Sequence, residues 1–363
     1  IALRFNALAF NSRSSVQGLT HTSSVAGPPI FIRNRRTTLN LTEQLSSRLV
    51  GQAHAVEQIV PYVQMHRAGL APEGRPVGVF LLLGPTGTGK TRTVEALADA
   101  LHGSEKQVLR IDCGEFQLDH EVAKLIGAPP GYLGHRETTP MLTQQKLNGV
   151  TSESSNLSLV LFDEIEKAAP SMMRILLGVL DKATLRLGDN TAVNFDRSMI
   201  FLTSNLGAAE MKRETGSGFG LASVAKRAQP TASKLNRIGM GAVKRRFAPE
   251  FVNRIDAIVT YKPLDDDALQ QIFEHQLAAL ENHIEARLEQ RAFDLRMEHS
   301  ARQFFLKLGT SSEYGARELK RAMLRHVTQP LAAMVESGAV PPGCEVVIWA
   351  PEGSSRLEFD VLE

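Results

Sequence analysis

The sequence has little cysteine, no long apolar run and almost no net charge. Its two cysteines, Cys113 and Cys344, lie far apart and lack the spacing of a metal site. This argues against a disulfide scaffold and favours a reduced compartment inside the cell, so we expect a cytoplasmic protein. No apolar run approaches the length needed to span a membrane, so no membrane partner is expected. A net charge of +2 argues against a dedicated nucleic-acid binder.

Acidic residues are missing from the first 37 positions, where five arginines stand among many serines and threonines; the first acid is Glu43. We expect residues 1–37 to form a tail. An organelle transit peptide has such a composition, but the chain starts at Ile1 rather than Met. A remnant of a longer protein is therefore at least as good an interpretation.

An apolar run at 77–83 leads into a glycine-rich loop, and a helical pattern follows it. The glycines let backbone N–H groups point inward, and the helix presents its positive end to phosphate oxygens. We expect Lys90 to reach the β- and γ-phosphates of ATP and Thr91 to supply a hydroxyl to Mg²⁺. The loop matches G-x-x-x-x-G-K-[ST] with Gly84, Pro85, Thr86, Gly87, Thr88, Gly89, Lys90 and Thr91.

Two later apolar runs end in polar side chains. The run at 157–162 is followed by Asp163 and Glu164, and the run at 199–204 by Asn205. Ligands of open α/β sheets bind beside the carboxyl ends of the strands. We expect Asp163 to hold Mg²⁺, directly or through water, and Glu164 to orient and polarise the attacking water. Asn205 can reach the γ-phosphate or that water.

The remaining pattern predicts an α/β domain at 38–262, with a parallel five-stranded sheet flanked by helices. A smaller, mainly helical domain with C-terminal β-strands is expected at 263–363. Residues 115–126 are expected to be helical, and residues 207–243 to form a mobile insertion with one helix. The expected strands of the first domain are 77–83, 108–112, 157–162, 199–204 and 257–260. Helices of the second are expected at 269–288, 298–308 and 316–337, and strands at 345–349 and 356–362.

Residues 127–135 read GAPPGYLGH and cannot form a helix or a central strand, because Pro129, Pro130 and the glycines forbid both. The segment places Tyr132 beside Leu133 at the tip of a loop. From composition alone, Tyr132 is equally well explained as a local anchor or as a displayed contact.

Seven motifs, taken in order, resemble the AAA+ module of the Clp unfoldases, and in particular the second ATPase ring of ClpB and ClpC. The resemblance covers residues 38–363 and implies a P-loop AAA+ fold, ATP and Mg²⁺ as cofactors, and a homo-oligomer in the form of a six-membered ring. The motifs are LVGQ (49–52), the phosphate loop, GAPPGYLG (127–134), LFDEIEKA (161–168), LTSNLG (202–207), FAPEFVNRID (247–256) and YGARELKRA (314–322).

The resemblance also implies roles for single residues. Asn205 would be the first sensor, and Arg317 the second sensor, touching the γ-phosphate. Arg254 would be the arginine finger that reaches the nucleotide of the neighbouring subunit. Without the family, surface ion pairing is the simpler expectation for Arg254 and Arg317. The adenine pocket would be lined by Val50, Gly51 and Gln52.

The implied activity is that of an ATP-driven protein unfoldase or chaperone acting on unfolded or aggregated proteins. Its substrate loop in a central pore would be Gly131, Tyr132, Leu133 and Gly134. One alternative is an ATPase that partners a Clp-type peptidase; such proteins carry an aliphatic-Gly-Phe/Leu tripeptide, and only residues 217–219 and 219–221 come near it. A nucleic-acid remodeller is less favoured, because no basic recognition helix or zinc spacing is present. A nucleotide switch without turnover is disfavoured by Glu164, Arg254 and Arg317.

The sequence departs from the family pattern at three places. Residues 135–139 replace an aromatic and an E-E-G-G turn after the loop tyrosine, Ala169 stands where the family commonly has His, and the second pore loop near 186–190 is altered. We therefore expect the grip on substrate to differ from that of the family.

Overall fold

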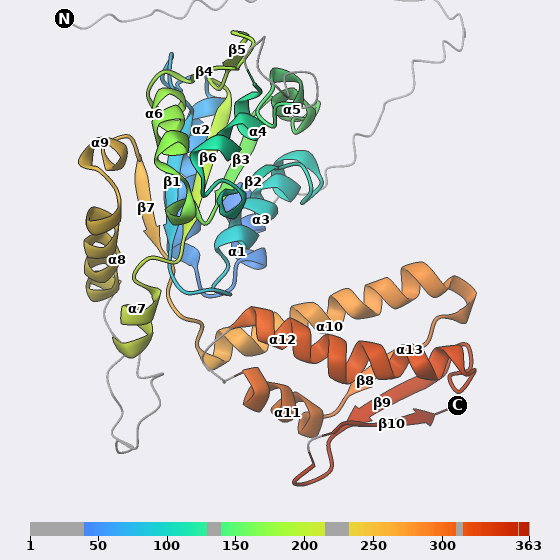
Figure 1. Cartoon of the computed structure of the whole chain (residues 1–363). Helices are drawn as coiled ribbons and strands as arrows, with labels where there is room; N and C mark the ends of the chain where they lie inside the picture. Colours follow the sequence, from blue (N-terminus) through green and yellow to red (C-terminus); the bar gives the residue numbers. More distant parts are fainter. Residues whose placement is uncertain (1–39, 129–138, 215–231, 310–314, 355, 363) are drawn as a thin grey trace, which may run out of the picture. The chain divides into compact units, whose positions relative to one another are not determined.

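The computed structural model describes residues 40–128, 139–214, 232–309, 315–354 and 356–362. A five-stranded sheet lies at the centre of the first half of the chain (Figure 1), in the order β2-β3-β6-β1-β7. Every pairing in it is parallel, which confirms the predicted parallel five-stranded sheet. The strands are β1 (Gly78–Leu83), β2 (Leu109–Asp112), β3 (Ser158–Asp163), β6 (Ser198–Ser204) and β7 (Ala257–Thr260).

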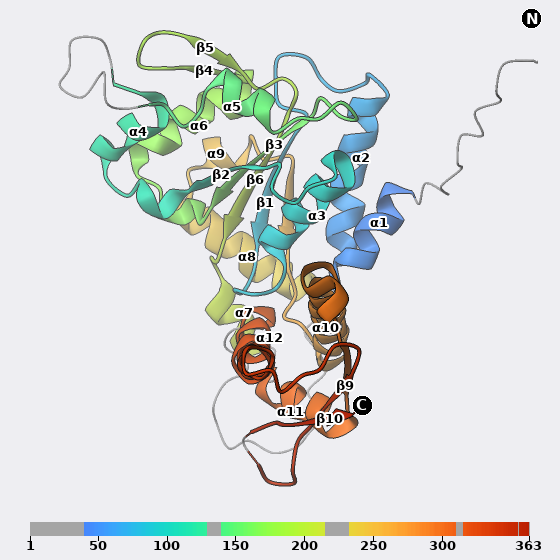
Figure 2. The same cartoon turned by 90° about the vertical axis from the view of Figure 1, so that its right-hand side faces the viewer.

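Helices cover both faces of this sheet (Figure 2), so its central strands are apolar on both sides. Alternate residues of β1 belong to different cores: Phe80 and Leu82 face one helical layer, and Val79 and Leu81 face the other. The first layer consists of α1 (Leu41–Arg48), α2 (Ala53–Arg67) and α3 (Lys90–His102). The second consists of α4 (Val122–Ile126), α5 (Gln144–Gly149), α6 (Pro170–Lys182), α8 (Ala232–Arg246) and α9 (Pro249–Val252).

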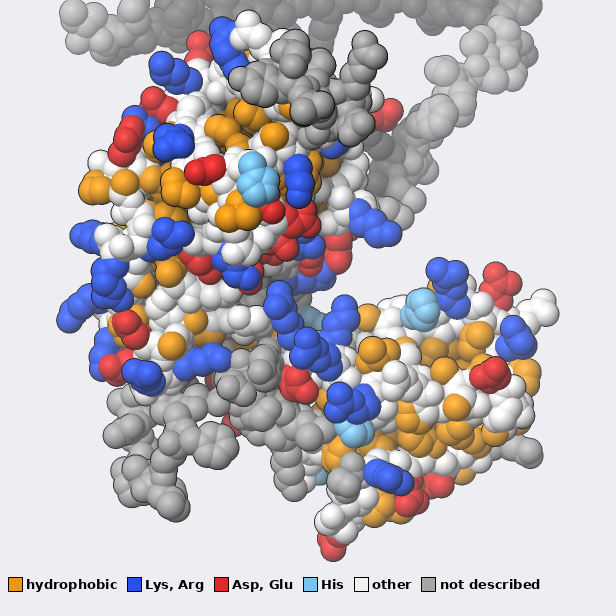
Figure 3. Space-filling view, viewed as in Figure 1, with side chains coloured by type: hydrophobic (Ala, Val, Ile, Leu, Met, Phe, Trp, Pro, Cys, Tyr) orange, Lys and Arg blue, Asp and Glu red, His pale blue; other side chains and the backbone are white. Residues whose placement is uncertain are grey.

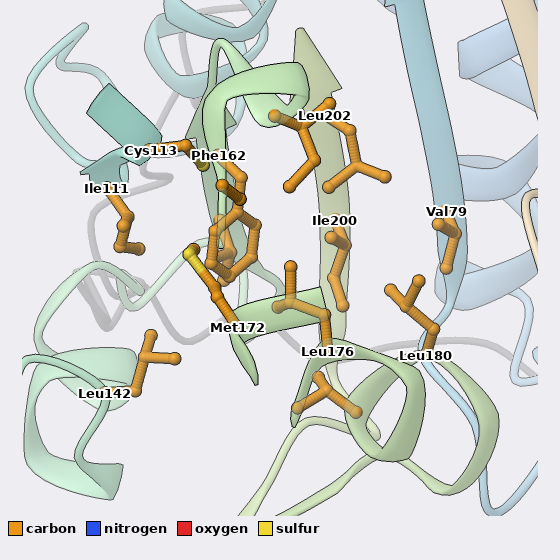
Figure 4. Packing of buried hydrophobic residues seen from close by; sticks show 14 of the residues in the cluster. Val79, Ile111, Cys113, Leu142, Phe162, Met172, Leu176, Leu180, Ile200 and Leu202 are labelled. Carbon is orange, nitrogen blue, oxygen red and sulfur yellow. The ribbon is translucent and has the colours of Figure 1, made fainter. Parts of the chain in front are cut away.

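The apolar stripe of α6 shows how the second layer packs. Met172, Leu176 and Leu180 recur every four residues and are at most 1% exposed. Figure 4 shows Met172 and Leu176 pointing toward Phe162 and Ile200 of the sheet. The apolar face of α6 therefore packs under the end of β3, in the same buried cluster as Phe162.

The second half of the chain contains a three-stranded sheet and helices with their own apolar clusters. Asp265 caps α10 by accepting a hydrogen bond from the N–H of Ala268 at 2.9 Å. The strand β8 was not predicted; it is short, carries polar residues and takes its register from its parallel pairing with β9. The elements are α10 (Asp266–Leu288), β8 (Asp294–Met297), α11 (His299–Gly309), α12 (Ala316–Met323), α13 (Gln329–Glu336), β9 (Glu345–Trp349) and β10 (Glu358–Leu362), with a 3-10 turn, η4 (Glu289–Arg291).

The single helix predicted at 316–337 is interrupted by one π-helical turn, η5 (Leu324–Thr328). Pro330 lies in the first turn of α13. Proline cannot donate to the carbonyl four residues earlier and its ring crowds that carbonyl, so a wider turn relieves the conflict.

Two predictions for the first half were wrong in part. Residues 115–126 are not one helix but 3-10 turns followed by α4. The carboxylates of Asp112 and Glu121 accept hydrogen bonds from the backbone N–H groups of Gly114 and Leu118, which compete with a continuous helix. The described part of 207–243 holds two helices, α7 (Ala208–Glu214) and the start of α8, rather than one. The turns are η1 (Cys113–Glu115) and η2 (Asp119–Glu121).

A hairpin of β4 (Thr184–Arg186) and β5 (Ala192–Asn194) follows α6. The expected tail, residues 1–37, lies outside the described residues. Among the helices that are described, none is long and apolar enough to cross a membrane. Cys113 and Cys344 are both free and buried.

Candidate functional site

The glycine-rich loop connects β1 to α3 and depends on left-handed backbone. Gly84 has a φ of 146°, and a Cβ there would lie 2.8 Å from the carbonyl oxygen of Tyr261, so only glycine fits. Gly87 and Gly89 also have positive φ, and a Cβ at Gly89 would meet no atom within 4 Å. Gly89 is the N-cap of α3, so the positive end of this helix faces open space where an anion can approach.

Tyr261 is hydrogen-bonded to residues on both sides of the loop. Its N–H donates to the carbonyl of Leu83 at 2.7 Å, and its hydroxyl shares a hydrogen bond with that of Thr93 at 2.7 Å. Burial raises the pKa of Tyr261, which keeps the phenol neutral. One buried side chain therefore ties the end of β1 to the first turns of α3.

Lys90 is 8% exposed and points back at the loop. Its Nζ donates to the carbonyl oxygens of Gly84 at 2.6 Å and Pro85 at 2.9 Å, and to Oδ1 of Asn205 at 2.9 Å. Burial lowers the pKa of Lys90 to about 8, with the carboxylates of Glu166, Asp163 and Glu164 opposing that effect.

The two predicted carboxylates, Asp163 at the end of β3 and Glu164 just after it, contact Thr203 near the end of β6. The hydroxyl of Thr203 donates to Oδ1 of Asp163 and accepts from the N–H of Glu164 at 3.0 Å. Glu164 has a φ of 55°, a left-handed conformation that costs a non-glycine residue on the order of 1–3 kcal/mol. This turn aims the Glu164 side chain away from the strand direction and into the site.

Asn205 joins the carboxylate to the lysine. Its Nδ2 donates to Oε1 of Glu164 at 3.3 Å, while its Oδ1 accepts from Lys90 and, at 3.4 Å, from the hydroxyl of Thr86. The other oxygen of Glu164 pairs with Nζ of Lys167 at 2.5 Å. The structure thus brings together the predicted Lys90, Asn205 and Glu164, which are linked in that order by side-chain hydrogen bonds.

Sequence reasoning gave no role to Glu166, Thr203 or Arg246. Glu166 lies in the turn η3 (Ile165–Lys167), and its Oε1 accepts from the N–H of Asn205 at 3.0 Å. Nε of Arg246 donates to the carbonyl oxygen of Glu166 at 3.0 Å. The only available signal was the second glutamate of LFDEIEKA, because a bond to a backbone N–H leaves no trace in sequence.

The segment 50–52 lies beside the loop. The Gln52 side chain is 1% exposed. Its Nε2 donates hydrogen bonds to the carbonyl oxygens of Thr88 at 3.3 Å and Lys262 at 2.9 Å. Gly51 has a φ of 73°, and a Cβ there would meet Ala268 at 3.4 Å. Val50 is half-buried. The predicted adenine-pocket residues are therefore placed next to the phosphate loop.

Arg317 also comes to the loop. The N–H of Ala316, at the start of α12, donates to the carbonyl of Gly87 at 3.3 Å. The next residue, Arg317, is exposed, and its positive charge is among those that lower the pKa of Lys90. Its guanidinium therefore lies within electrostatic reach of the phosphate loop.

Arg254 does not lie beside the phosphate loop. Asp256, two residues later, accepts from the N–H of Val79 at 2.8 Å, near the start of β1, whereas the loop begins after its end. The five steps from Val79 to Gly84 cover about 16 Å at roughly 3.3 Å per residue. Arg254 is 3.2 Å from Asp181, within ion-pair distance but without hydrogen-bond geometry. Both border a hollow of about 290 Å³ that is also lined by Arg75, Leu180 and Asn253.

The predicted substrate loop, Gly131, Tyr132, Leu133 and Gly134, lies outside the described residues, as do the tripeptides at 217–221. The donor set of the site fits a Mg²⁺-nucleotide: a glycine cradle, a buried lysine, the hydroxyl residue Thr91 in the first turn of α3 and the carboxylate of Asp163. Among the described residues no group of three or more His, Cys, Asp or Glu could hold a metal.

A parallel sheet with this loop after β1 and an acidic pair at the end of β3, one strand beyond β6, defines a P-loop ATPase. Residues 75–258 match the family described as AAA domain (Cdc48 subfamily), and residues 264–348 match the C-terminal, D2-small domain of ClpB protein. The chain belongs to the AAA family, as a module of the Clp type that is similar to the second ATPase domain of ClpB and ClpC. Membership implies nucleotide binding.

Named relatives agree with this assignment. The chain is 38% identical over 318 residues to the chaperone protein ClpB of Rhodopseudomonas palustris, covering 87% of this chain and 33% of the relative. It is 35% identical to the ATP-dependent Clp protease ATP-binding subunit ClpC of Staphylococcus saprophyticus, covering 90% and 38%. A closed-state reconstruction of Hsp104 with ATPγS and FITC-casein has a TM-score of 0.74 at 29% identity, covering 90% of this chain and 52% of that one. The chain spans about a third of the length of the curated relatives that it matches.

Proposed function

We propose that this chain binds ATP with Mg²⁺ and hydrolyses it. The observation that carries the proposal is the pair of hydrogen bonds that links Lys90 to Asn205 and Asn205 to Glu164. Lys90 neutralises phosphate charge, and Glu164 polarises a water for attack while the Asn205 amide fixes the direction of the carboxylate. Thr91 and Asp163 would hold Mg²⁺, which when bound neutralises charge on the phosphate oxygens.

The remaining residues of the site bind and sense the nucleotide in this proposal. Val50, Gly51 and Gln52 contact the adenine, supported by the bonds of Gln52 to Thr88 and Lys262. Arg317 senses the γ-phosphate, supported by the contact of its helix with Gly87. We place the boundary between the ATPase domain and the smaller domain after Lys262.

The proposed assembly is a homo-oligomer, a six-membered ring, in which Arg254 acts on the nucleotide of the next subunit. The support is the distance of Arg254 from its own loop, together with its position beside an open hollow. Arg254 precedes β7 and is well placed to reach a neighbour, because β7 begins at the end of the sheet away from the phosphate loop (Figure 1).

The proposed work of hydrolysis is the unfolding of protein substrates, unfolded or aggregated, by moving Tyr132 loops along a central pore. The support is the similarity to ClpB chaperones and to Hsp104 solved with casein. We propose a cytoplasmic location, supported by the two free cysteines.

The experiment that tests this proposal measures ATPase rate per subunit against protein concentration, with and without casein. If Arg254 of the neighbouring subunit completes each site, the ATPase rate per subunit should rise with protein concentration. If the protein is an unfoldase, casein should change that rate. A rate per subunit that is constant with concentration and indifferent to casein would contradict both parts.

The relative named as a Clp protease ATP-binding subunit suggests a peptidase partner as a second candidate function. The same assay, repeated with a Clp-type peptidase, separates the two. Casein peptides that appear only when ATP, this chain and the peptidase are all present would favour the partner role.

A further inference from the structure

Glu166 has a position in the site but no role in the chemistry above. Its Oε1 accepts a hydrogen bond from the backbone N–H of Asn205 at 3.0 Å. Asn205 is the residue whose amide contacts both Lys90 and Glu164. The Glu166 carboxylate therefore fixes the backbone from which that amide reaches into the site.

The second carboxylate oxygen of Glu166, Oε2, is buried and has no hydrogen-bond partner within the described part of the chain. An unpartnered buried polar atom costs about 1–3 kcal/mol, and such exceptions in a folded protein need an explanation. Among the carboxylates that oppose the effect of burial on the pKa of Lys90, Glu166 contributes most. The side chain thus acts on two members of the site.

The turn that carries Glu166 is held from its other side. Arg246, the last residue of α8, donates from both Nε and Nη2 to the carbonyl oxygen of Glu166. Its neighbour Arg245 points elsewhere and pairs with Glu210 at 3.1 Å. Figure 3 shows Lys and Arg side chains over the part of the surface that α8 occupies in Figure 1.

We propose that Glu166 is a positioning residue for ATP hydrolysis: its carboxylate holds the backbone of Asn205 so that the amide stays between Lys90 and Glu164, and Arg246 holds the turn from which Glu166 acts. This inference rests on the proposed ATPase function and deepens it. The bond acts on a backbone N–H, so its loss displaces Asn205 without removing any group assigned to phosphate or Mg²⁺. Turnover is affected, and nucleotide affinity is not.

Two substitutions separate the bond from the mere presence of the side chain. Glu166→Ala removes the acceptor, whereas Glu166→Gln keeps an oxygen that can accept from Asn205. A lost hydrogen bond of ordinary strength predicts that Glu166→Ala lowers kcat about tenfold. The Kd for a fluorescent ATP analogue should change less than about threefold. Glu166→Gln should recover most of the lost kcat.

A double-mutant cycle tests whether Glu166 acts through Asn205. Adding Glu166→Ala to Asn205→Ala should cause no further loss of kcat, because the amide that Glu166 positions is already gone. Hydrogen exchange of the Asn205 amide in the nucleotide-free protein gives a readout independent of turnover. Exchange should be faster in Glu166→Ala than in wild type, and restored in Glu166→Gln.

Arg246→Ala has a matched control in Arg245→Ala, one residue away in the same helical turn. Arg246→Ala should lower kcat severalfold with the Kd unchanged, since the turn loses one of its supports. Arg245→Ala should leave both values at the wild-type level.

The results that would overturn the proposal are distinct from those that would overturn the ATPase function. Normal kcat in a stable Glu166→Ala protein, additive losses in the double mutant, or parallel losses of thermal stability, affinity and kcat would each reject the positioning role. Failure of Glu166→Gln to recover kcat would reject it too, because charge rather than the bond would then matter. No hydrolysis by the wild-type protein would reject the proposed function, and the exchange measurement would still test the bond.

Discussion

Lys90 donates a hydrogen bond to the amide oxygen of Asn205 at 2.9 Å, although the two residues are 115 positions apart in the sequence. The order of the strands explains the contact. Asn205 follows β6, which lies between β1, the strand before Lys90, and β3, the strand before Glu164. An amide carried by the middle strand can reach both neighbours, one through its oxygen and one through its nitrogen.

Glu164→Gln should bind ATP but scarcely hydrolyse it. Lys90, Thr91 and Asp163 still hold the nucleotide, whereas the attacking water loses its polarising carboxylate. The Kd for ATP should stay within about tenfold of wild type, a cost under roughly 1.4 kcal/mol. Titration with a fluorescent ATP analogue and a phosphate-release assay measure the two quantities. Near-normal turnover would remove Glu164 from its role.

The phosphate loop and the acidic pair could be predicted because each is a local pattern that follows an apolar strand. The contact between Lys90 and Asn205 could not, since the strands read alike and their order is a property of the folded sheet. Glu166 was missed for a related reason: its bond depends on the left-handed turn at Glu164. β8 was missed because a short edge strand takes its register from its partner.

Arg254→Ala should lose turnover while each subunit still binds ATP. A guanidinium supplied by a neighbour acts on transition-state charge, and such arginines contribute about 10³ to 10⁵ in rate, or roughly 4 to 7 kcal/mol. In this structure Arg254 pairs with Asp181 rather than with its own phosphate loop. Steady-state ATPase and ATP binding, measured on the same preparation, check the expectation.

A mixing experiment tests whether Arg254 acts on the nucleotide of the neighbouring subunit. Arg254→Ala and Glu164→Gln subunits, each inactive alone, should recover some ATPase when combined, because certain seams then pair an intact Glu164 with an intact Arg254. Co-assembly is shown separately by cross-linking. The absence of recovery in every co-assembled mixture would argue for action within one subunit.

The thiol of Cys113 should be inert in the folded protein. It is 0% exposed, and burial, with the nearby Asp112 carboxylate next in effect, raises its pKa. The reactive form is the thiolate, so a raised pKa lowers reactivity at a given pH. Alkylation near neutral pH should leave Cys113 unmodified until denaturant is added. Rapid labelling of Cys113 in native protein, located by mass spectrometry, would show that the core around it opens readily.

Tyr132→Ala should abolish unfolding of a tagged or aggregated substrate and leave basal ATPase within a few-fold of wild type, because no phosphate-contacting group changes. Tyr132 lies outside the described residues, so the expectation comes from the sequence of its loop, where glycines and prolines preclude regular structure. A local anchor would instead lose thermal stability and ATPase together. Normal unfolding by a stable, ATPase-active Tyr132→Ala protein would exclude pore threading by this residue.

Gly188 lies between β4 and β5, at the tip of their hairpin. Its N–H donates to the carbonyl of Ile126 at 2.8 Å, and a Cβ there would lie 2.4 Å from the carbonyl oxygen of Gly127. The hairpin therefore packs against the residues that lead into the Tyr132 segment. Gly188→Ala must displace one backbone from the other, at a cost of about 1–3 kcal/mol in the free energy of unfolding.

Gly178→Ala is the matched control, because it lies inside α6 and the nearest atom to its added Cβ is 3.8 Å away. Alanine in a helix interior should be neutral or stabilising by roughly 0.5–1 kcal/mol. Denaturant unfolding of both variants measures the difference. If the hairpin also supports the substrate segment, Gly188→Ala should reduce the response of ATPase to casein more than it reduces basal ATPase. Equal stability of the two variants would show that the hairpin tip is free to move away from Gly127.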